Sequence, residues 1–341
     1  MIIPIEEVFM FTSRQIHLAS RPTGLPTHDN FKTVEQELPE LQHGQVLVKN
    51  AWLSVDPYMR PRMIDRKSYI APLQLNEVIE GGAIGEVIAS NNTQFPVGTQ
   101  VSNLAGWCTT FISDGTDLTP LPASDLPAHL FLGMLGMTGL TAWAGLNKVI
   151  QLNADDTVFV SAASGAVGSI ACQIAKLKGC KVIASVGSEE KAQWVKSLGV
   201  DAVINYKAVD DLTEALKQAA PEGIDVYFEN VGGEHLEAAL NVMNDYGRIS
   251  VCGMIANYNA DTPQPGPSNL FFINSKKLTV QGFIVIDYFE HYPEFLAQMT
   301  EWMQAGKITS EVTIYEGLDQ TVDAFLGLFT GKNKGKMLVK L

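Results

Sequence analysis

Two glycines, Gly165 and Gly168, stand three residues apart in a turn whose chemistry suits phosphate binding. They close the segment Thr157–Gly168, and an apolar, helix-like run follows over Ser169–Lys178. A strand, a glycine turn and a helix in this order are typical of the first unit of a dinucleotide-binding fold, because glycine lets the backbone approach a pyrophosphate at the helix N-terminus. The pattern is A-x-G-x-x-G, with Ala163 in place of the usual first glycine. An ordinary glycine turn without a ligand is the alternative.

The end of the second expected strand, Lys181–Val186, bears on the choice between NADPH and NADH. In this kind of fold an acid there usually accepts hydrogen bonds from the ribose hydroxyls of NAD. This chain has Gly187 and Ser188 instead, and Lys191 follows one turn later. If Ser188 caps the next helix, Lys191 lies at its third position, where the helix dipole disfavours a cation. This placement favours a 2′-phosphate as the partner of Lys191, and hence NADPH, whereas a solvated surface lysine is the alternative.

Two further residues follow the expected third and fourth strands. Tyr206 comes directly after Ala202–Asn205, and Asn230 comes directly after Asp225–Glu229. Ligands of open parallel sheets bind at the carboxyl ends of the strands, so both side chains are candidates for cofactor contact. A core tyrosine and a turn asparagine are the alternatives.

Alternating strands and helices after Asn153 are expected to position these residues. The expected strands are Thr157–Ser161, Lys181–Val186, Ala202–Asn205, Asp225–Glu229, Gly247–Cys252 and Leu278–Phe283. The expected helices include Ser169–Lys178, Glu189–Leu198, Asp211–Ala219, Glu234–Met243 and Tyr292–Ala305. Strands separated by amphipathic helices of this length predict a parallel sheet with right-handed crossovers, and six strands complete a doubly wound α/β domain.

The first part of the chain has a different sequence pattern. Over residues 45–122, short β-rich segments alternate with glycine, proline and asparagine turns, which predicts a small β-barrel or a partly open sheet. Residues 125–146 contain few charged residues, and this composition suits closely packed helices. The proline-rich segment Ile255–Asn269 is predicted to be a loop, either a lid over a binding site or a surface loop. The last residues, 336–341, predict a strand that returns to the N-terminal domain.

Length, charge and cysteine usage narrow the class of protein. A chain of 341 residues predicts two domains, and a net charge of −13 argues against a nucleic-acid partner. The four cysteines form no C-x-x-C pair, so free thiols in a reducing compartment are expected. The N-terminus lacks the pattern of a secretory signal, and the uncharged runs are rich in small and polar residues. We therefore expect a cytoplasmic protein without a membrane span.

Motifs spread along nearly the whole chain carry a resemblance to a known family. They are DPYMR at Asp56–Arg60, GMTGLTA at Gly136–Ala142, GAVG at Gly165–Gly168, QIAKLKGCKV at Gln173–Val182 and GKNKGK at Gly331–Lys336. Together they resemble the zinc-independent medium-chain dehydrogenase/reductases, and within them the branch of leukotriene hydroxydehydrogenases, prostaglandin reductases and bacterial curcumin reductases. The A-x-x-G-x-x-G form of this branch accounts for the missing first glycine, with Ala162 in its first position.

The resemblance implies a Rossmann-type domain inserted into a GroES-like β-barrel domain that the end of the chain completes. The expected boundaries are 1–128 and 305–341 for the GroES-like substrate domain and 129–304 for the nucleotide-binding domain. NADPH is the implied cofactor, and a homodimer is the implied assembly. The implied cofactor contacts are Met137, Thr141, Gly165, Ala166, Val167, Gly168, Ser188, Lys191, Tyr206, Asn230, Cys252, Gly253, Tyr258, Phe283, Ile284, Val285 and Asn333.

The resemblance also bears on metal chemistry. Zinc-dependent relatives place a cysteine ligand near this chain's Ser54–Asp56 and a histidine ligand near its Glu80–Gly82, and neither residue type occurs there. No metal is therefore expected. Without a Lewis acid to polarise an alcohol oxygen, plain alcohol oxidation is not expected.

The implied reaction is hydride transfer from NADPH to the β-carbon of an α,β-unsaturated ketone or aldehyde. The enolate that develops needs a hydrogen-bond donor, either Tyr258 or the ribose hydroxyl of the cofactor, and Tyr258 or water then protonates the α-carbon. Tyr58 and Tyr69 are candidates for stacking on the substrate, or else ordinary core or surface tyrosines. Arg60 either orients a polar end of the substrate or ties loops together.

Two alternatives stay open at this point. One is an NADPH:quinone reductase of the same superfamily. The other is a non-enzymatic NADPH-binding sensor that has kept the fold, because a fold alone does not establish an activity.

Overall fold

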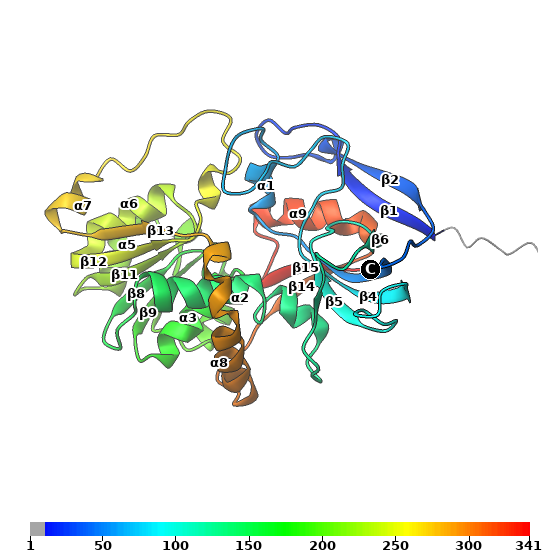
Figure 1. The fold of residues 1–341 in the computed structure, drawn as a ribbon. Helices are drawn as coiled ribbons and strands as arrows, with labels where there is room; N and C mark the ends of the chain where they lie inside the picture. The colour runs from blue at the N-terminus through cyan, green and yellow to red at the C-terminus, as the bar shows by residue number, and fades with distance from the viewer. Residues whose placement is uncertain (1–10) are drawn as a thin grey trace, which may run out of the picture.

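The computed structural model describes residues 11–341 and contains two large β-sheets that lie in separate lobes (Figure 1). Residues 1–10, which belong to the expected substrate domain and to the segment read as lacking a secretory signal, lie outside the described part of the chain. The central stretch of the chain forms one lobe. The N-terminal stretch and the chain end together form the other, at the right of Figure 1.

The first lobe contains a six-stranded parallel sheet in the order β10-β9-β8-β11-β12-β13. Its strands are β8 Thr157–Val160, β9 Lys181–Val186, β10 Ala202–Asn205, β11 Ile224–Glu229, β12 Met243–Val251 and β13 Thr279–Gly282. This confirms the predicted doubly wound sheet. β12 begins four residues earlier than predicted, at Met243, because a register shift against β11 lets its first residue pair before the regular ladder begins.

Helices cover both faces of this sheet. They are α2 Met137–Ala144, α3 Gly168–Leu177, α4 Glu189–Ser197, α5 Leu212–Ala219, α6 Gly233–Val242, α7 Phe271–Ser275 and α8 Tyr292–Gln304. Neighbouring strand residues point to opposite faces. Val158 and Val160 therefore pack with α2, α3 and α8, whereas Phe159 packs with α5 and α6. Two apolar layers thus hold the sheet between its helices and fix the strand ends.

The second lobe contains a mixed sheet in the order β14-β15-β3-β4-β5-β7, with β6 paired to β3, and a separate β1-β2 hairpin. Its elements are β1 Phe11–Leu18, β2 Phe31–Leu38, β3 Val46–Ser54, α1 Met59–Arg62, β4 Ala83–Ser90, β5 Gln100–Asn103, β6 Thr110–Ser113, β7 Thr119–Pro120, β14 Val312–Glu316, α9 Thr321–Thr330 and β15 Lys336–Lys340. β15 pairs antiparallel with β3, so the predicted return of the chain end is confirmed.

Short helical turns connect these elements. They are η1 His28–Asn30, η2 Ala128–Leu132, η3 Gly145–Val149, η4 Tyr206–Ala208, η5 Ile255–Asn257, η6 Val285–His291 and η7 Leu318–Gln320. The segment after η5 is irregular up to α7, as its alternating prolines predict.

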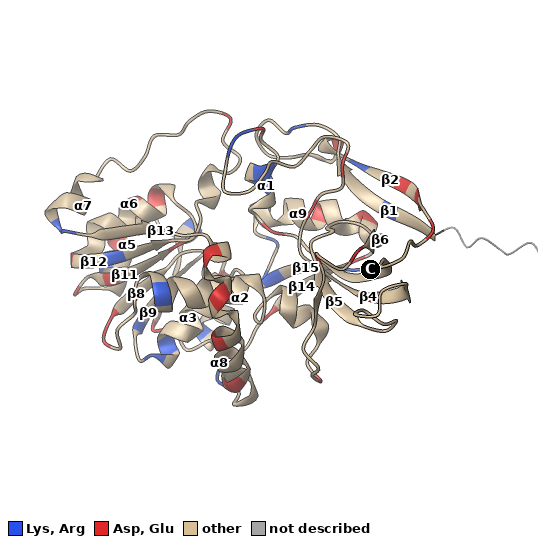
Figure 2. Ribbon diagram, in the orientation of Figure 1, with Lys and Arg blue, Asp and Glu red and all other residues tan. Residues whose placement is uncertain are grey.

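Charged residues are spread over both lobes. Figure 2 shows basic positions on α1 and in the segment that leads into β15, on the side of the second lobe that faces the six-stranded sheet. None of the helices within residues 11–341 is both long enough and apolar enough to cross a membrane.

Candidate cofactor and substrate site

The turn between β8 and α3 has the geometry of a phosphate-binding turn. The Gly165 N–H donates to the carbonyl oxygen of Ala162 at 2.9 Å, and Ala162 has a φ of 47°, in the left-handed region that alanine rarely adopts. A Cβ atom at Gly168 would lie 2.4 Å from that same oxygen, so only glycine fits. No side chain caps α3. The Ser169 N–H already donates to the Gly165 oxygen at 3.0 Å, so the N–H groups of residues 166–168 are the ones that can meet an anion.

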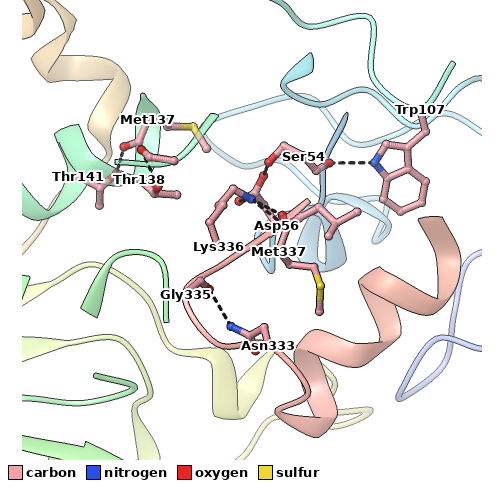
Figure 3. A network of polar contacts seen from close by, with 12 residues as sticks. Ser54, Asp56, Trp107, Met137, Thr138, Thr141, Asn333, Gly335, Lys336 and Met337 are labelled. Carbon is pink, nitrogen blue, oxygen red and sulfur yellow. Dashed lines mark hydrogen bonds and ion pairs between the residues drawn. The ribbon is translucent and has the colours of Figure 1, made fainter. Parts of the chain in front are cut away.

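The segment before β15 packs directly on this turn. The Gly335 N–H donates to the carbonyl oxygen of Ser164 at 2.9 Å. Asn333 donates from Nδ2 to the Gly335 oxygen at 3.1 Å, as Figure 3 shows. The structure therefore places Asn333 beside the glycine turn, although more than 150 residues separate them in sequence.

The end of β9 brings Ser188, Lys191 and Tyr206 together. Ser188 caps α4 by accepting the Lys191 N–H at 3.3 Å, which confirms the predicted capping arrangement. A Cβ atom at Gly187 would lie 3.1 Å from the Tyr206 hydroxyl, so the tyrosine lies against the strand end. The ring of Tyr206 packs edge-on against His235 at 4.9 Å between centroids, which supports its orientation.

Lys191 is a half-buried cation. Burial lowers its pKa, and the neighbouring positive charge of Lys207 lowers it further. Its Nζ donates to the carbonyl oxygen of Gly331 at 2.8 Å, and no carboxylate within the described residues forms an ion pair with it. An anion at this position would stabilise the charge, so the local electrostatics suit a phosphate group.

The carboxyl ends of β12 and β13 line an open pocket of about 400 Å³. Its lining includes four of the expected cofactor contacts, Cys252, Gly253, Phe283 and Ile284. Val285 follows at the start of η6. Asn230 lies at the end of β11 and donates to Ser161, at 3.0 Å from its backbone and 2.8 Å from its side chain.

Glu229 is a buried carboxyl at this site that our sequence analysis missed. Its Oε1 accepts hydrogen bonds from the Tyr227 hydroxyl at 2.6 Å, from the N–H of Val231 at 2.6 Å and from that of Gly232 at 2.9 Å. Burial raises its pKa. An acid ending an otherwise apolar strand, YFEN, was the available signal, and its role is to tie the β11 turn to Ser161.

Tyr258 follows η5 and folds back over the pocket lining. A Cβ atom at Gly253 would lie 3.0 Å from its hydroxyl, and that hydroxyl accepts the Met254 N–H at 3.4 Å. Burial raises the pKa of Tyr258 to about 12, and nearby Cys252 and Tyr69 contribute in the same direction. The phenol therefore stays protonated at neutral pH and can donate a hydrogen bond.

The three expected substrate contacts lie in different environments. Tyr58 precedes α1, and its pKa is raised by burial and then by Asp56. Tyr69 is half exposed and acts electrostatically on Tyr258. Arg60, in contrast, is only 1% exposed and donates to the carbonyl oxygens of neighbouring loops. The structure brings Tyr69 near the pocket, while the guanidinium of Arg60 ties loops together.

Met137 and Thr141 lie in the first turns of α2. The Thr141 hydroxyl donates to the carbonyl oxygen of Met137 at 2.7 Å, and both appear beside the β15 segment in Figure 3. This bond uses the only donor of the Thr141 side chain, so toward a ligand the hydroxyl can act only as a hydrogen-bond acceptor.

A buried ion pair joins the chain end to the DPYMR motif. Lys336 Nζ lies 2.9 Å from Asp56 Oδ1 and also donates to the oxygens of Val55 and Met337. Ser54 donates to the same carboxylate (Figure 3). Both charged side chains are buried, so this network fixes β15 against α1 at the edge of the site.

We expect Lys336→Met to lower the free energy of unfolding by about 3–5 kcal/mol, because it leaves the buried Asp56 carboxylate without its partner. Lys334→Met is the matched control, since Lys334 and Glu311 form a more exposed pair at 3.3 Å worth about 1 kcal/mol or less. Urea unfolding of both variants measures the difference. Equal stability of the two variants would contradict a special role for the buried pair.

A parallel sheet with an uncapped glycine turn, on which the segment before β15 of the second lobe packs, defines a dinucleotide-binding α/β protein. Comparison with known proteins agrees. Residues 14–121 match a family described as the N-terminal domain of oxidoreductase, and residues 166–301 match one described as zinc-binding dehydrogenase. Within residues 11–341, no three His, Cys, Asp or Glu side chains gather as a metal-binding group.

Relatives cover nearly the whole chain. Prostaglandin reductase 1 of Bos taurus is 45% identical over 322 residues, covering 93% of this chain and 95% of the relative. The NADPH-dependent curcumin reductase of Escherichia coli is 39% identical over 335 residues, covering 96% and 97%. The crystal structure of CurA from Vibrio vulnificus in complex with NADPH has a TM-score of 0.91 at 44% identity, covering 96% and 98%. The chain belongs to the zinc-independent medium-chain dehydrogenase/reductases.

Proposed function

We propose that this protein uses NADPH to reduce the carbon–carbon double bond of α,β-unsaturated ketones or aldehydes. The chain is an NADP-dependent oxidoreductase of a branch whose members include a prostaglandin reductase and a curcumin reductase. The observation that carries the proposal is the position of Tyr258, a protonated phenol over the pocket between the ends of β12 and β13.

The chain's own residues fit NADPH. The glycine turn and the uncapped N-terminus of α3 suit its pyrophosphate, and Gly168 lets α3 pack closely on the turn, since a Cβ atom there would lie 2.4 Å from the Ala162 oxygen. We assign the 2′-phosphate to Lys191 and Tyr206, with Ser188 beside them. The remaining contacts are assigned to Ala166, Val167, Asn230, Asn333, Met137, Thr141 and the pocket residues at the ends of β12 and β13.

When bound, NADPH supplies a hydride to the β-carbon of the substrate. Tyr258 donates a hydrogen bond to the carbonyl oxygen, where negative charge develops as the enolate forms. The α-carbon then takes a proton from Tyr258 or from water. Tyr58 and Tyr69 are assigned to the walls that hold the substrate from the side of the second lobe.

A panel of substrates tests this function. Purified protein with NADPH is mixed with curcumin-like dienones, 2-alkenals, keto-prostaglandins and quinones, and the loss of NADPH absorbance is followed. Turnover of enones or enals with a product saturated at the double bond supports the proposal. Turnover of quinones alone indicates a quinone reductase, and tight NADPH binding without turnover indicates a sensor.

We also propose a homodimer joined through β13. This strand ends the six-stranded sheet, its four residues are exposed, and Val280 keeps 41% of its surface accessible. An open sheet edge with apolar side chains is a template for pairing with a second copy. The nearby exposed Ile286 and Phe289 extend the apolar surface.

We expect Val280→Lys to convert the dimer to a monomer, because a lysine at an edge strand opposes strand pairing. Light scattering after gel filtration measures the mass. Val97→Lys, at an exposed valine of the other lobe, is the control and should leave the mass unchanged. A native protein that is already monomeric would refute the dimer.

The division of the chain is likewise a proposal. Residues 1–128 and 305–341 are assigned to the substrate domain and 129–304 to the NADPH-binding domain, which is consistent with the two separate sheets. We assign the protein to the cytoplasm and to small-molecule substrates, with neither nucleic acid nor membrane as partner.

A further inference from the structure

Arg60 joins three segments that are far apart in sequence. It lies on α1 and is 1% exposed. Its Nη2 donates to the carbonyl oxygens of Gly24 at 2.8 Å and Pro22 at 3.4 Å. Its Nε lies 3.1 Å from Oδ1 of Asn259, a residue of the other lobe. The guanidinium therefore bridges the loop before β2, the DPYMR helix and the loop that follows η5.

Asn259 is the residue directly after Tyr258. The loop to which both belong is exposed over residues 261–266. At its far end Asn269 donates from Nδ2 to the Glu237 carbonyl oxygen at 2.9 Å, which anchors the loop to its own lobe. Tyr258 itself is held within its own lobe, because its N–H donates to the Ile255 oxygen at 3.2 Å and its hydroxyl accepts the Met254 N–H at 3.4 Å. The contact with Arg60 adds, at the next residue, a hydrogen bond that comes from the other lobe.

The charge of Arg60 is poorly compensated. No carboxylate within the described residues lies close enough for an ion pair with it, and its buried Nη1 has no hydrogen-bond partner. Burial lowers its pKa, and Asp261 opposes that shift only from a distance. A buried cation held by neutral acceptors costs stability, so its geometry rather than its charge pairing explains its position.

We propose that Arg60 is a positioning residue for Tyr258. Its hydrogen bond to Asn259, the next residue, crosses between the two lobes and holds Tyr258 over the pocket. The planar guanidinium suits this task, because Nη2 donates to Gly24 while Nε is shared between the Gly24 oxygen at 3.2 Å and Asn259 Oδ1 at 3.1 Å, which ties the two segments together in a fixed geometry. Nε and Nη2 are occupied by loop acceptors and the side chain is only 1% exposed, so we assign Arg60 a role through Tyr258 and not in direct contact with the substrate. This inference rests on the proposed function, in which Tyr258 is the hydrogen-bond donor.

Asn259→Ala tests the inference without emptying the buried Arg60 site. We expect kcat for an enone to fall about tenfold with the substrate KM within about twofold. The variant displaces the phenol but removes no contact that binds the substrate. Asn259→Asp keeps an oxygen acceptor for the guanidinium and should restore most of kcat. Asn269→Ala, which loosens the other anchor of the same loop, is the matched control and should leave kcat within about twofold.

A double-mutant cycle separates positioning from general damage. In a Tyr258→Phe background, Asn259→Ala should reduce kcat by less than about twofold, since the group it positions is gone. A full tenfold loss in that background, an equal loss from Asn269→Ala, or no loss from Asn259→Ala in the native background would each overturn the inference. If Tyr258→Phe itself has native kcat, the proposed role of Tyr258 fails first and the inference falls with it.

Discussion

We expect Lys191→Ala to raise the Kd for NADPH by about 10–100-fold and to leave the Kd for NADH within about twofold. The lost interaction is a charge-assisted hydrogen bond to the 2′-phosphate, worth about 1.5–3 kcal/mol, and tenfold in Kd corresponds to about 1.4 kcal/mol. The structure agrees with the direction of this effect, because burial lowers the pKa of Lys191 and, among residues 11–341, its Nζ donates only to the Gly331 carbonyl oxygen. In the proposed complex a phosphate would supply negative charge beside this cation.

Isothermal titration or quenching of tryptophan fluorescence gives both dissociation constants for each variant. Lys196→Ala, in the last turn of the same helix α4, is the control and should change neither constant. Lys191→Arg keeps the charge and should retain most of the preference for NADPH. An equal loss of affinity for both cofactors would remove the assignment of Lys191 to the 2′-phosphate.

The six-stranded sheet could be predicted from sequence because its signals are local. Each of its strands is a short apolar run bounded by turns, and amphipathic helices of ordinary length separate them. The second lobe was harder to predict. The β1–β2 hairpin (Phe11–Leu18 and Phe31–Leu38), β14 and α9 were not predicted. The three strands show only a weak alternation of polar and apolar residues, and α9 packs through Phe325 on Phe31 and Trp107, which lie far along the chain.

In the site, too, residues marked by a local sequence signal could be predicted and most of the others could not. Lys191 could be singled out because it conflicts with a local rule, since a cation at the third position of a helix opposes the dipole. The structure confirmed the Ser188 cap that this argument needed. The buried pair of Lys336 and Asp56, the carboxyl of Glu229 and the bond between Arg60 and Asn259 were not predicted. The pair of Lys336 and Asp56 and the bond between Arg60 and Asn259 join segments that only folding brings together, so no local pattern marks them. For Glu229 the acid at the end of its strand was a local signal, but its bond to Ser161 depends on folding.

The second large effect concerns Tyr258. Tyr258→Phe should lower kcat for an enone by about 10–1000-fold, because it removes a donor aimed at the oxygen on which enolate charge develops. The ring and its packing over Gly253 are retained, so NADPH affinity should stay within about twofold of native. Because the pKa of Tyr258 is about 12, the phenol keeps its proton between pH 6 and 9. Deprotonation of Tyr258 therefore cannot account for a fall in kcat over that range.

Stopped-flow measurement of NADPH oxidation under single-turnover conditions isolates the chemical step from product release. Tyr246→Phe removes a phenol from a residue that is 69% exposed and should leave the rate unchanged. Native turnover in Tyr258→Phe would assign enolate stabilisation to the ribose hydroxyl of the cofactor instead. A reduced rate with an unchanged NADPH Kd supports Tyr258 as the donor, because only an interaction stronger in the transition state lowers kcat without weakening binding.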